Sequence, residues 1–169
     1  LQIPSDVAPQ STPVTPQKAP ARPGSMAQLL EQGTVLVLAR QPQGLSMGSG
    51  FFISRRHVLS NAHVVGNAGQ AFLINKATGG VLQATVRHRS ADGGRDFALL
   101  ELPADAAITP LEFAPGVERT QRVSAWGFPG AVTNDDPKFM ALLQGNDSAV
   151  PEVVYTEGVV SVILELTPP

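Results

Sequence analysis

Two residues far apart in the sequence, His63 and Asp96, have side chains suited to proton transfer. His63 falls just past the end of one apolar segment, and Asp96 opens another on the same face as Ala98 and Leu100. A carboxylate on the apolar face of a strand is costly unless a donor reaches it, and a histidine Nδ1–H is a natural donor. An imidazole held in this way can act as a general base, so the pair indicates acid–base chemistry.

Each of these residues taken alone has a simpler explanation. A histidine at a strand end is more often an ordinary polar residue, and Asp96 could merely pair with Arg95. We interpret His57 and His88 as structural, because one lies within a strand and the other between arginines. The three histidines lack the paired spacing of metal ligands, so neither a metal nor a cofactor is implied.

Three other polar or aromatic features receive structural interpretations. Ser49 lies between glycines that allow tight strand packing. Asp135-Asp136 is expected to form a solvated turn, since a calcium site would need more oxygen ligands. The single tryptophan, Trp126, is expected to belong to the core.

Composition narrows the classes of protein that remain. The 169 residues carry 12 basic and 14 acidic side chains without a basic cluster, which argues against nucleic-acid binding. The absence of cysteine excludes disulfides, thiolate catalysis and cysteine-based metal centres. No apolar run approaches the roughly 20 residues that span a bilayer. With 16 glycines and 15 prolines, the chain favours short segments separated by turns.

The elements that must position His63 and Asp96 are short strands. Residues 1–25 form a proline-rich leader, expected to be disordered, and a short helix follows at Met26–Glu31. Alternating or compact apolar runs then predict about six strands before residue 103, enough to close a small barrel. These strands are Thr34–Ala39, Met47–Ser54, His57–Ser60, Ala71–Asn75, Val81–Arg89 and Asp96–Leu102.

Two further strands are predicted downstream, at Gln121–Gly127 and Val153–Leu166. A long loop, Phe128–Pro151, rich in Gly, Pro, Asn and Asp, is expected between them. Two strands do not make a stable sheet alone, so they must pack on the first barrel or pair with more chain. We therefore divide the chain into a first barrel, residues 26–115, and an incomplete second barrel, residues 116–169.

Four motifs in order resemble the trypsin/chymotrypsin superfamily, most closely its cysteine-free bacterial branch, the Deg/HtrA-like proteases. They are Gly48-Ser49-Gly50-Phe51, Ser60-Asn61-Ala62-His63-Val64-Val65, Asp96-Phe97-Ala98-Leu99-Leu100-Glu101-Leu102 and Ala125-Trp126-Gly127-Phe128-Pro129-Gly130, followed by a matching strand at Thr156–Ser161. The resemblance covers nearly all of residues 34–166. It implies an all-β, trypsin-like double barrel with the active site between the barrels. His63 would be the general base, and Asp96 would fix its tautomer and stabilise the imidazolium.

The nucleophilic serine that this resemblance requires is not in the chain. The family places it in a Gly-x-Ser-Gly-Gly stretch after the Thr156–Ser161 strand, and no such stretch occurs here. Ser148 lies before that strand and lacks the following glycines, whose N–H groups form an oxyanion hole. We therefore reject Ser148 as the nucleophile.

The leading hypothesis is a serine endopeptidase chain that acts on peptide or protein substrates. It supplies His63 and Asp96, while a C-terminal remainder of the domain or a second chain supplies the serine. By analogy with the family, the location is periplasmic or secreted. The alternatives are a non-catalytic, protease-like module that binds peptides or regulates, and an inactive fragment.

Overall fold

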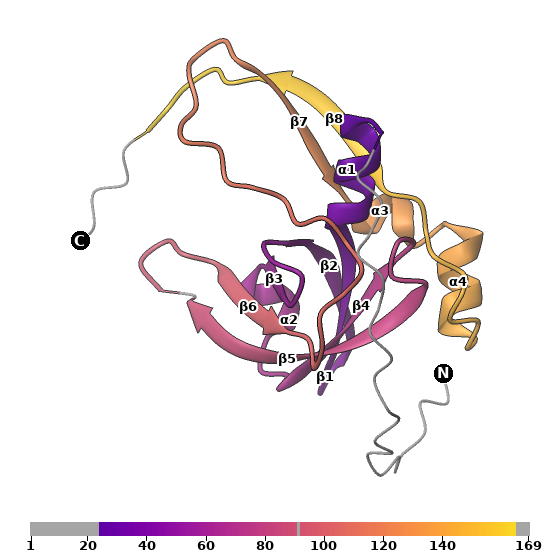
Figure 1. Cartoon of the computed structure of the whole chain (residues 1–169). Helices are drawn as coiled ribbons and strands as arrows, with labels where there is room; N and C mark the ends of the chain where they lie inside the picture. Colours follow the sequence, from indigo (N-terminus) through magenta and orange to yellow (C-terminus); the bar gives the residue numbers. More distant parts are fainter. Residues whose placement is uncertain (1–23, 91, 165–169) are drawn as a thin grey trace.

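The computed structural model describes residues 24–90 and 92–164 (Figure 1). Most of the expected proline-rich leader, residues 1–23, lies outside this range. Helix α1 (Met26–Gly33) begins at Ser25, whose side chain accepts a hydrogen bond from the Gln28 N–H. The short helix expected here is confirmed and is two residues longer. No helix within the described ranges is both long enough and apolar enough to cross a membrane.

Six antiparallel strands close into a barrel, as the sequence predicts. In space they follow the order β1-β2-β3-β6-β5-β4, so each strand bonds to two neighbours. Their bounds are β1 (Thr34–Gln41), β2 (Gly44–Phe52), β3 (His57–Ser60), β4 (Gln70–Asn75), β5 (Gly80–Ser90) and β6 (Phe97–Glu101). The expected all-β fold with one complete barrel is confirmed.

The core fills the inside of this barrel with the alternate side chains of its strands. Ala84 is buried, and Leu82 and Val86 on the same face of β5 pack against the core cluster, which confirms the predicted period of two. In β6, Ala98 and Leu100 are buried in the same way. The interior is therefore apolar and fixes the strand register, because a slip of one residue would turn polar side chains inward.

Asn75 is a buried polar residue that ties β4 to the end of α1. Its Nδ2 group lies 2.5–3.1 Å from the carbonyl oxygens of Glu31, Gln32 and Thr34, and its Oδ1 accepts from the Ala77 N–H at 2.6 Å. The last carbonyls of a helix have no partner within the helix. The carboxamide donates to two such carbonyls, those of Glu31 and Gln32, and Asn75 is only 2% exposed to solvent.

The second sheet has two antiparallel strands, β7 (Arg122–Gly127) and β8 (Val154–Val159), and β7 lies against β1 and β2 (Figure 1). β8 is shorter than the strand expected to reach Leu166, and residues 160–164 are not in a strand. Trp126 is not a core residue as predicted. It is partly exposed, because most of this sheet is uncovered, and it stacks on the exposed Tyr155 with ring centroids 4.9 Å apart. The division at residues 115 and 116 stays a prediction.

The expected loop Phe128–Pro151 is wrong in part, because it contains helices α3 (Gly130–Thr133) and α4 (Pro137–Leu143). Asp136 is not merely in a solvated turn: it caps α4, and its carboxylate accepts from the N–H groups of Lys138 and Glu152. α4 folds because its apolar side chains bury against the outside of the barrel. This second core cluster comprises Leu36, Leu38, Ile74, Phe128, Phe139, Leu142 and Val150.

We predict that Asn75→Ala lowers the free energy of unfolding by about 1–3 kcal/mol, the usual cost of leaving buried polar groups unpaired. Urea denaturation followed by circular dichroism measures this change. The exposed Asn67→Ala serves as the matched control and should stay within about 0.5 kcal/mol of the wild type. An Asn75→Ala variant as stable as that control would contradict the role given to the carboxamide.

Candidate active site

The pairing of β3 with β6 brings His63 and Asp96 to the same end of the barrel. Ser60, the last residue of β3, pairs with Ala98 near the start of β6. The chain leaves β3 through Asn61 and enters the short helix α2 (Ala62–Val65), which carries His63. Asp96 directly precedes β6. The structure thus places the predicted pair in contact, although the two residues are 33 positions apart.

Asp96 makes two hydrogen bonds to His63. The imidazole Nδ1 lies 2.5 Å from Oδ2, and the His63 main-chain N–H donates to Oδ1 at 2.9 Å. The side chains are 72% and 40% exposed, so Asp96 is less buried than a carboxylate on the apolar face of β6 was expected to be. It lies at the open end of the strand, yet the donor predicted for it is present.

This arrangement fixes which imidazole nitrogen is basic. An ionised carboxylate only accepts, so His63 must carry its proton on Nδ1 to bond Asp96. A neutral imidazole with the proton on Nδ1 has its lone pair on Nε2. The histidine side chain is mostly exposed, so this nitrogen can receive a proton from an incoming hydroxyl or water.

Glycines of β2 allow α2 to sit close to the barrel. A Cβ at Gly48 would lie 2.4 Å from a methyl carbon of Val64, the buried neighbour of His63 in α2. A Cβ at Gly50 would lie 2.8 Å from the Leu59 carbonyl oxygen. The interpretation of these glycines as packing positions is confirmed, and at Gly48 the packing partner is the helix that holds the histidine.

Ser49 joins the two sheets, a role that the sequence did not reveal. Its Oγ accepts from the Phe128 N–H at 2.8 Å, at the end of β7. Its main-chain carbonyl accepts from the buried Ser60 hydroxyl at 2.9 Å. The strand that leads to His63 is therefore linked through Ser49 to the first residue after β7.

Ser148 is exposed in the turn between α4 and β8, and among the described residues its hydroxyl bonds only Asn146. The Asp147 carbonyl oxygen would be 3.1 Å from a Cβ at Gly80, which puts this turn beside the β4–β5 connection. The structure does not bring Ser148 to the His63–Asp96 pair by any contact within the described chain. Its rejection as a nucleophile agrees with this placement.

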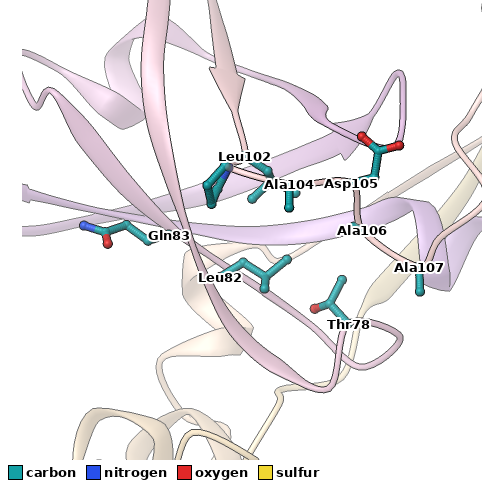
Figure 2. Close-up of a pocket in the computed structure, with 9 residues that line it drawn as sticks. Thr78, Leu82, Gln83, Leu102, Ala104, Asp105, Ala106 and Ala107 are labelled. Atoms are coloured by element: carbon teal, nitrogen blue, oxygen red, sulfur yellow. The ribbon is translucent and has the colours of Figure 1, made fainter. Parts of the chain in front are cut away.

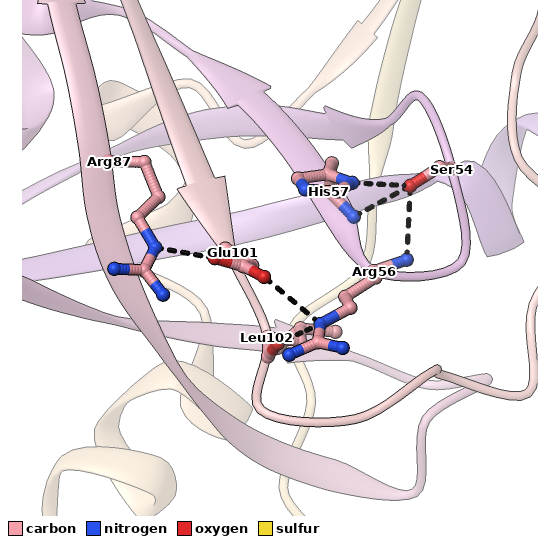
Figure 3. Close-up of polar contacts among 6 residues, drawn as sticks. All are labelled: Ser54, Arg56, His57, Arg87, Glu101 and Leu102. Atoms are coloured by element: carbon pink, nitrogen blue, oxygen red, sulfur yellow. Dashed lines mark hydrogen bonds and ion pairs between the residues drawn. The ribbon is translucent and has the colours of Figure 1, made fainter.

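A second polar cluster lies at the other end of β3 and β6 (Figure 3). Glu101, the last residue of β6, pairs with Arg56 and Arg87. The Ser54 hydroxyl lies 2.9 Å from the His57 Nδ1 and also accepts the N–H groups of Arg56 and His57. This cluster closes the turn before β3, which supports the structural interpretation of His57.

A small, mainly apolar pocket opens at that same end (Figure 2). It is lined by the β4–β5 turn, by β5 and by the residues after β6, among them Thr78, Leu82 and Leu102. Asp96 lies directly before the first residue of β6, whereas the pocket lies beyond the last residue of that strand. The pocket therefore does not belong to the candidate site. Within residues 24–90 and 92–164, no three His, Asp or Glu side chains gather as a metal site would require.

With this geometry established, comparison with family models places the chain in a class. The model of the trypsin-like peptidase domain matches residues 48–165, well over half of the chain. The chain therefore belongs to the trypsin-like peptidase family, which confirms the resemblance seen in the motifs. A comparison with curated proteins gave no match.

Three solved protease structures share the fold. The inactive form of Rv3671c protease is 23% identical with a TM-score of 0.58, covering 92% of this chain and 66% of that chain. The active form, from M. tuberculosis, is 29% identical with a TM-score of 0.52, covering 75% and 56%. The serine endoprotease from Yersinia pestis is 20% identical with a TM-score of 0.56, covering 83% and 45%. This chain thus spans no more than 66% of the length of these three chains.

The hydrogen bonds from His63 hold the pKa of the Asp96 carboxyl below its usual 3.8, and the main-chain N–H makes the largest contribution, ahead of the imidazole. A carboxyl group whose pKa is lower in the folded than in the unfolded chain stabilises the fold at pH values above its ordinary pKa. That stabilisation is lost as the pH falls through the lowered value. The exposed setting keeps the effect modest because water screens it.

We predict that His63→Ala leaves the pKa of Asp96 below 3.8, since the main-chain N–H of residue 63 remains to donate. The pKa should rise only partway from the wild-type value, by the loss of the imidazole. Titration of the Asp96 carboxyl carbon by ¹³C NMR measures both values. A return to the full ordinary pKa in His63→Ala would show that the imidazole, and not the amide, is the main cause.

Proposed function

We propose that this chain is part of a serine endopeptidase and contributes the histidine and aspartate of its catalytic triad. The observation that carries the proposal is the contact of His63 with Asp96 at the end of a trypsin-like barrel, with Nδ1 turned to the carboxylate. The serine hydroxyl would come from a C-terminal remainder of the domain or from a second chain. The substrate would be a peptide or protein.

The proposed reaction begins when the Nε2 atom of His63 takes the proton of the serine hydroxyl as its oxygen attacks the scissile carbonyl. The imidazolium formed is stabilised by the Asp96 carboxylate, whose pKa the hydrogen bonds from His63 lower below its ordinary value. His63 then gives the proton to the leaving amine, and the acyl-enzyme is hydrolysed by water in the same way. Two of the three triad groups are in this chain, so the chain alone would be inactive.

The proposed location is periplasmic or secreted, on the analogy with the family. A non-catalytic module that binds peptides remains the second candidate. The two candidates differ in whether an activated serine accompanies the chain.

We predict that a fluorophosphonate, which reacts with activated serines, labels a polypeptide that carries a Gly-x-Ser-Gly stretch and is associated with this chain. The 17.7 kDa chain itself should stay unlabelled. His63→Ala should slow the labelling by about 10³-fold or more, because the general base is lost. Denaturing intact-mass analysis identifies the labelled species.

The outcomes of this experiment separate the candidates. Label on Ser148 of this chain would overturn its rejection as the nucleophile. No label on any associated polypeptide would favour the non-catalytic module. His57→Ala is the matched control, because it removes a histidine of the structural cluster and should leave the labelling rate unchanged.

A further inference from the structure

Asp96 follows a glycine-containing turn that has few neighbours and lies outside the strand ladder. The connection before it contains Gly93 and Gly94, both with positive φ values of 57° and 77°. A Cβ at either glycine would have no neighbour within 4 Å. Asp96 itself is outside the β6 ladder, which begins at Phe97. The position of the carboxylate therefore depends on contacts that reach Asp96 from other elements.

One such contact comes from Asn61. Its Nδ2 lies 3.0 Å from the main-chain carbonyl oxygen of Asp96. A carbonyl only accepts, so the carboxamide must present its NH₂ group to it. Asn61 lies between Ser60, which ends β3, and α2, which carries His63. Ser60 and Ala98 are the last pair between β3 and β6. The Asn61 bond adds a further link just beyond that pair, between the segment that leads to His63 and the segment that precedes β6.

The Asn61 side chain does not form the capping hydrogen bond that its position favours. It occupies the N-cap position of α2, where an asparagine side chain commonly accepts a hydrogen bond from the first turn of the helix. Within the described chain, the Asn61 side chain makes no such cap bond. Its carboxamide bonds the main chain of Asp96 instead. Helix capping therefore does not explain the orientation of this side chain.

We propose that Asn61 is a positioning residue that holds the main chain of Asp96, so that the carboxylate meets the Nδ1–H of His63. This inference rests on the proposed function, because it concerns the same pair of residues. Among the described residues, the hydrogen bond of the Asn61 side chain goes to the main chain of Asp96 and not to the imidazole. It acts by keeping Asp96 in register with α2, so its loss lets the carboxylate move away from His63.

The tautomer of His63 reports on this role without any need for activity. A carboxylate held at Nδ1 favours the Nδ1–H tautomer, whereas an unrestrained imidazole favours Nε2–H. His57 supplies an internal reference. The Ser54 hydroxyl already accepts two main-chain N–H groups, so it donates its proton to Nδ1 of His57 and favours the Nε2–H form there (Figure 3).

The experiment measures ¹⁵N shifts of the histidine rings in the labelled 169-residue chain at about pH 9, where an ordinary histidine is neutral. We expect the Nδ1–H form to predominate at His63 in the wild type. Asn61→Ser keeps a good N-cap residue but is too short to reach the Asp96 carbonyl. It should shift His63 towards Nε2–H, as Asp96→Asn should. Asn67→Ser is the matched control and should not change the tautomer ratio of His63 from the wild-type value.

Each result decides the matter. Suppose that Asn61→Ser keeps the wild-type tautomer ratio at His63 while Asp96→Asn loses the Nδ1–H form. That result would overturn the role of Asn61 and leave the proposed function intact. An Nε2–H form of His63 in the wild type would overturn both. An unchanged His57 signal and amide spectrum show that a variant is folded. If Asn61→Ser fails that check, Asn61→Ala replaces it with the same expected shift and the same contradicting result.

Discussion

The pairing of β3 with β6 is the interaction on which the candidate site depends. It sets Ser60 opposite Ala98 and so places the chain that follows β3 beside the chain that precedes β6. His63 and Asp96 lie on these two extensions, outside the ladder itself. Their contact therefore depends on strand register. A slip of one residue would turn alternate side chains to the wrong face and also separate the pair.

The rest of the fold holds that register. Closure gives each of the six strands two hydrogen-bonded neighbours, and the buried side chains inside the barrel oppose sliding. Gly48 lets α2 pack against β2, and Ser49 links the same strand to Phe128. The apolar cluster under α4 attaches that helix, and Phe128 directly after β7, to the outside of the barrel. A rigid support of this kind suits a site whose chemistry depends on the aim of one imidazole.

Much of this was accessible from the sequence because it rests on short-range patterns. Alternation predicts the face of β5 that is buried, and the cost of a carboxylate on an apolar strand predicts a partner for Asp96. The helices at 130–133 and 137–143 were missed, because glycine, proline and aspartate suggested a loop. Asp136-Pro137 is nevertheless a helix-start signal. Asn61 could not be found, since its acceptor is a main-chain carbonyl that no residue type reveals. Trp126 was misplaced, because the sequence does not show which face of a sheet is left uncovered.

The central claim is that His63 and Asp96 work as one unit in peptide hydrolysis. The most direct test is a double-mutant cycle on the protease that includes the serine-bearing segment, with kcat/KM measured for His63→Ala, Asp96→Asn and the double variant. Groups that act as a unit are strongly non-additive. We predict that the double variant is about as impaired as His63→Ala alone. Losses that multiply, or an Asp96→Asn variant with wild-type kcat/KM, would contradict the claim.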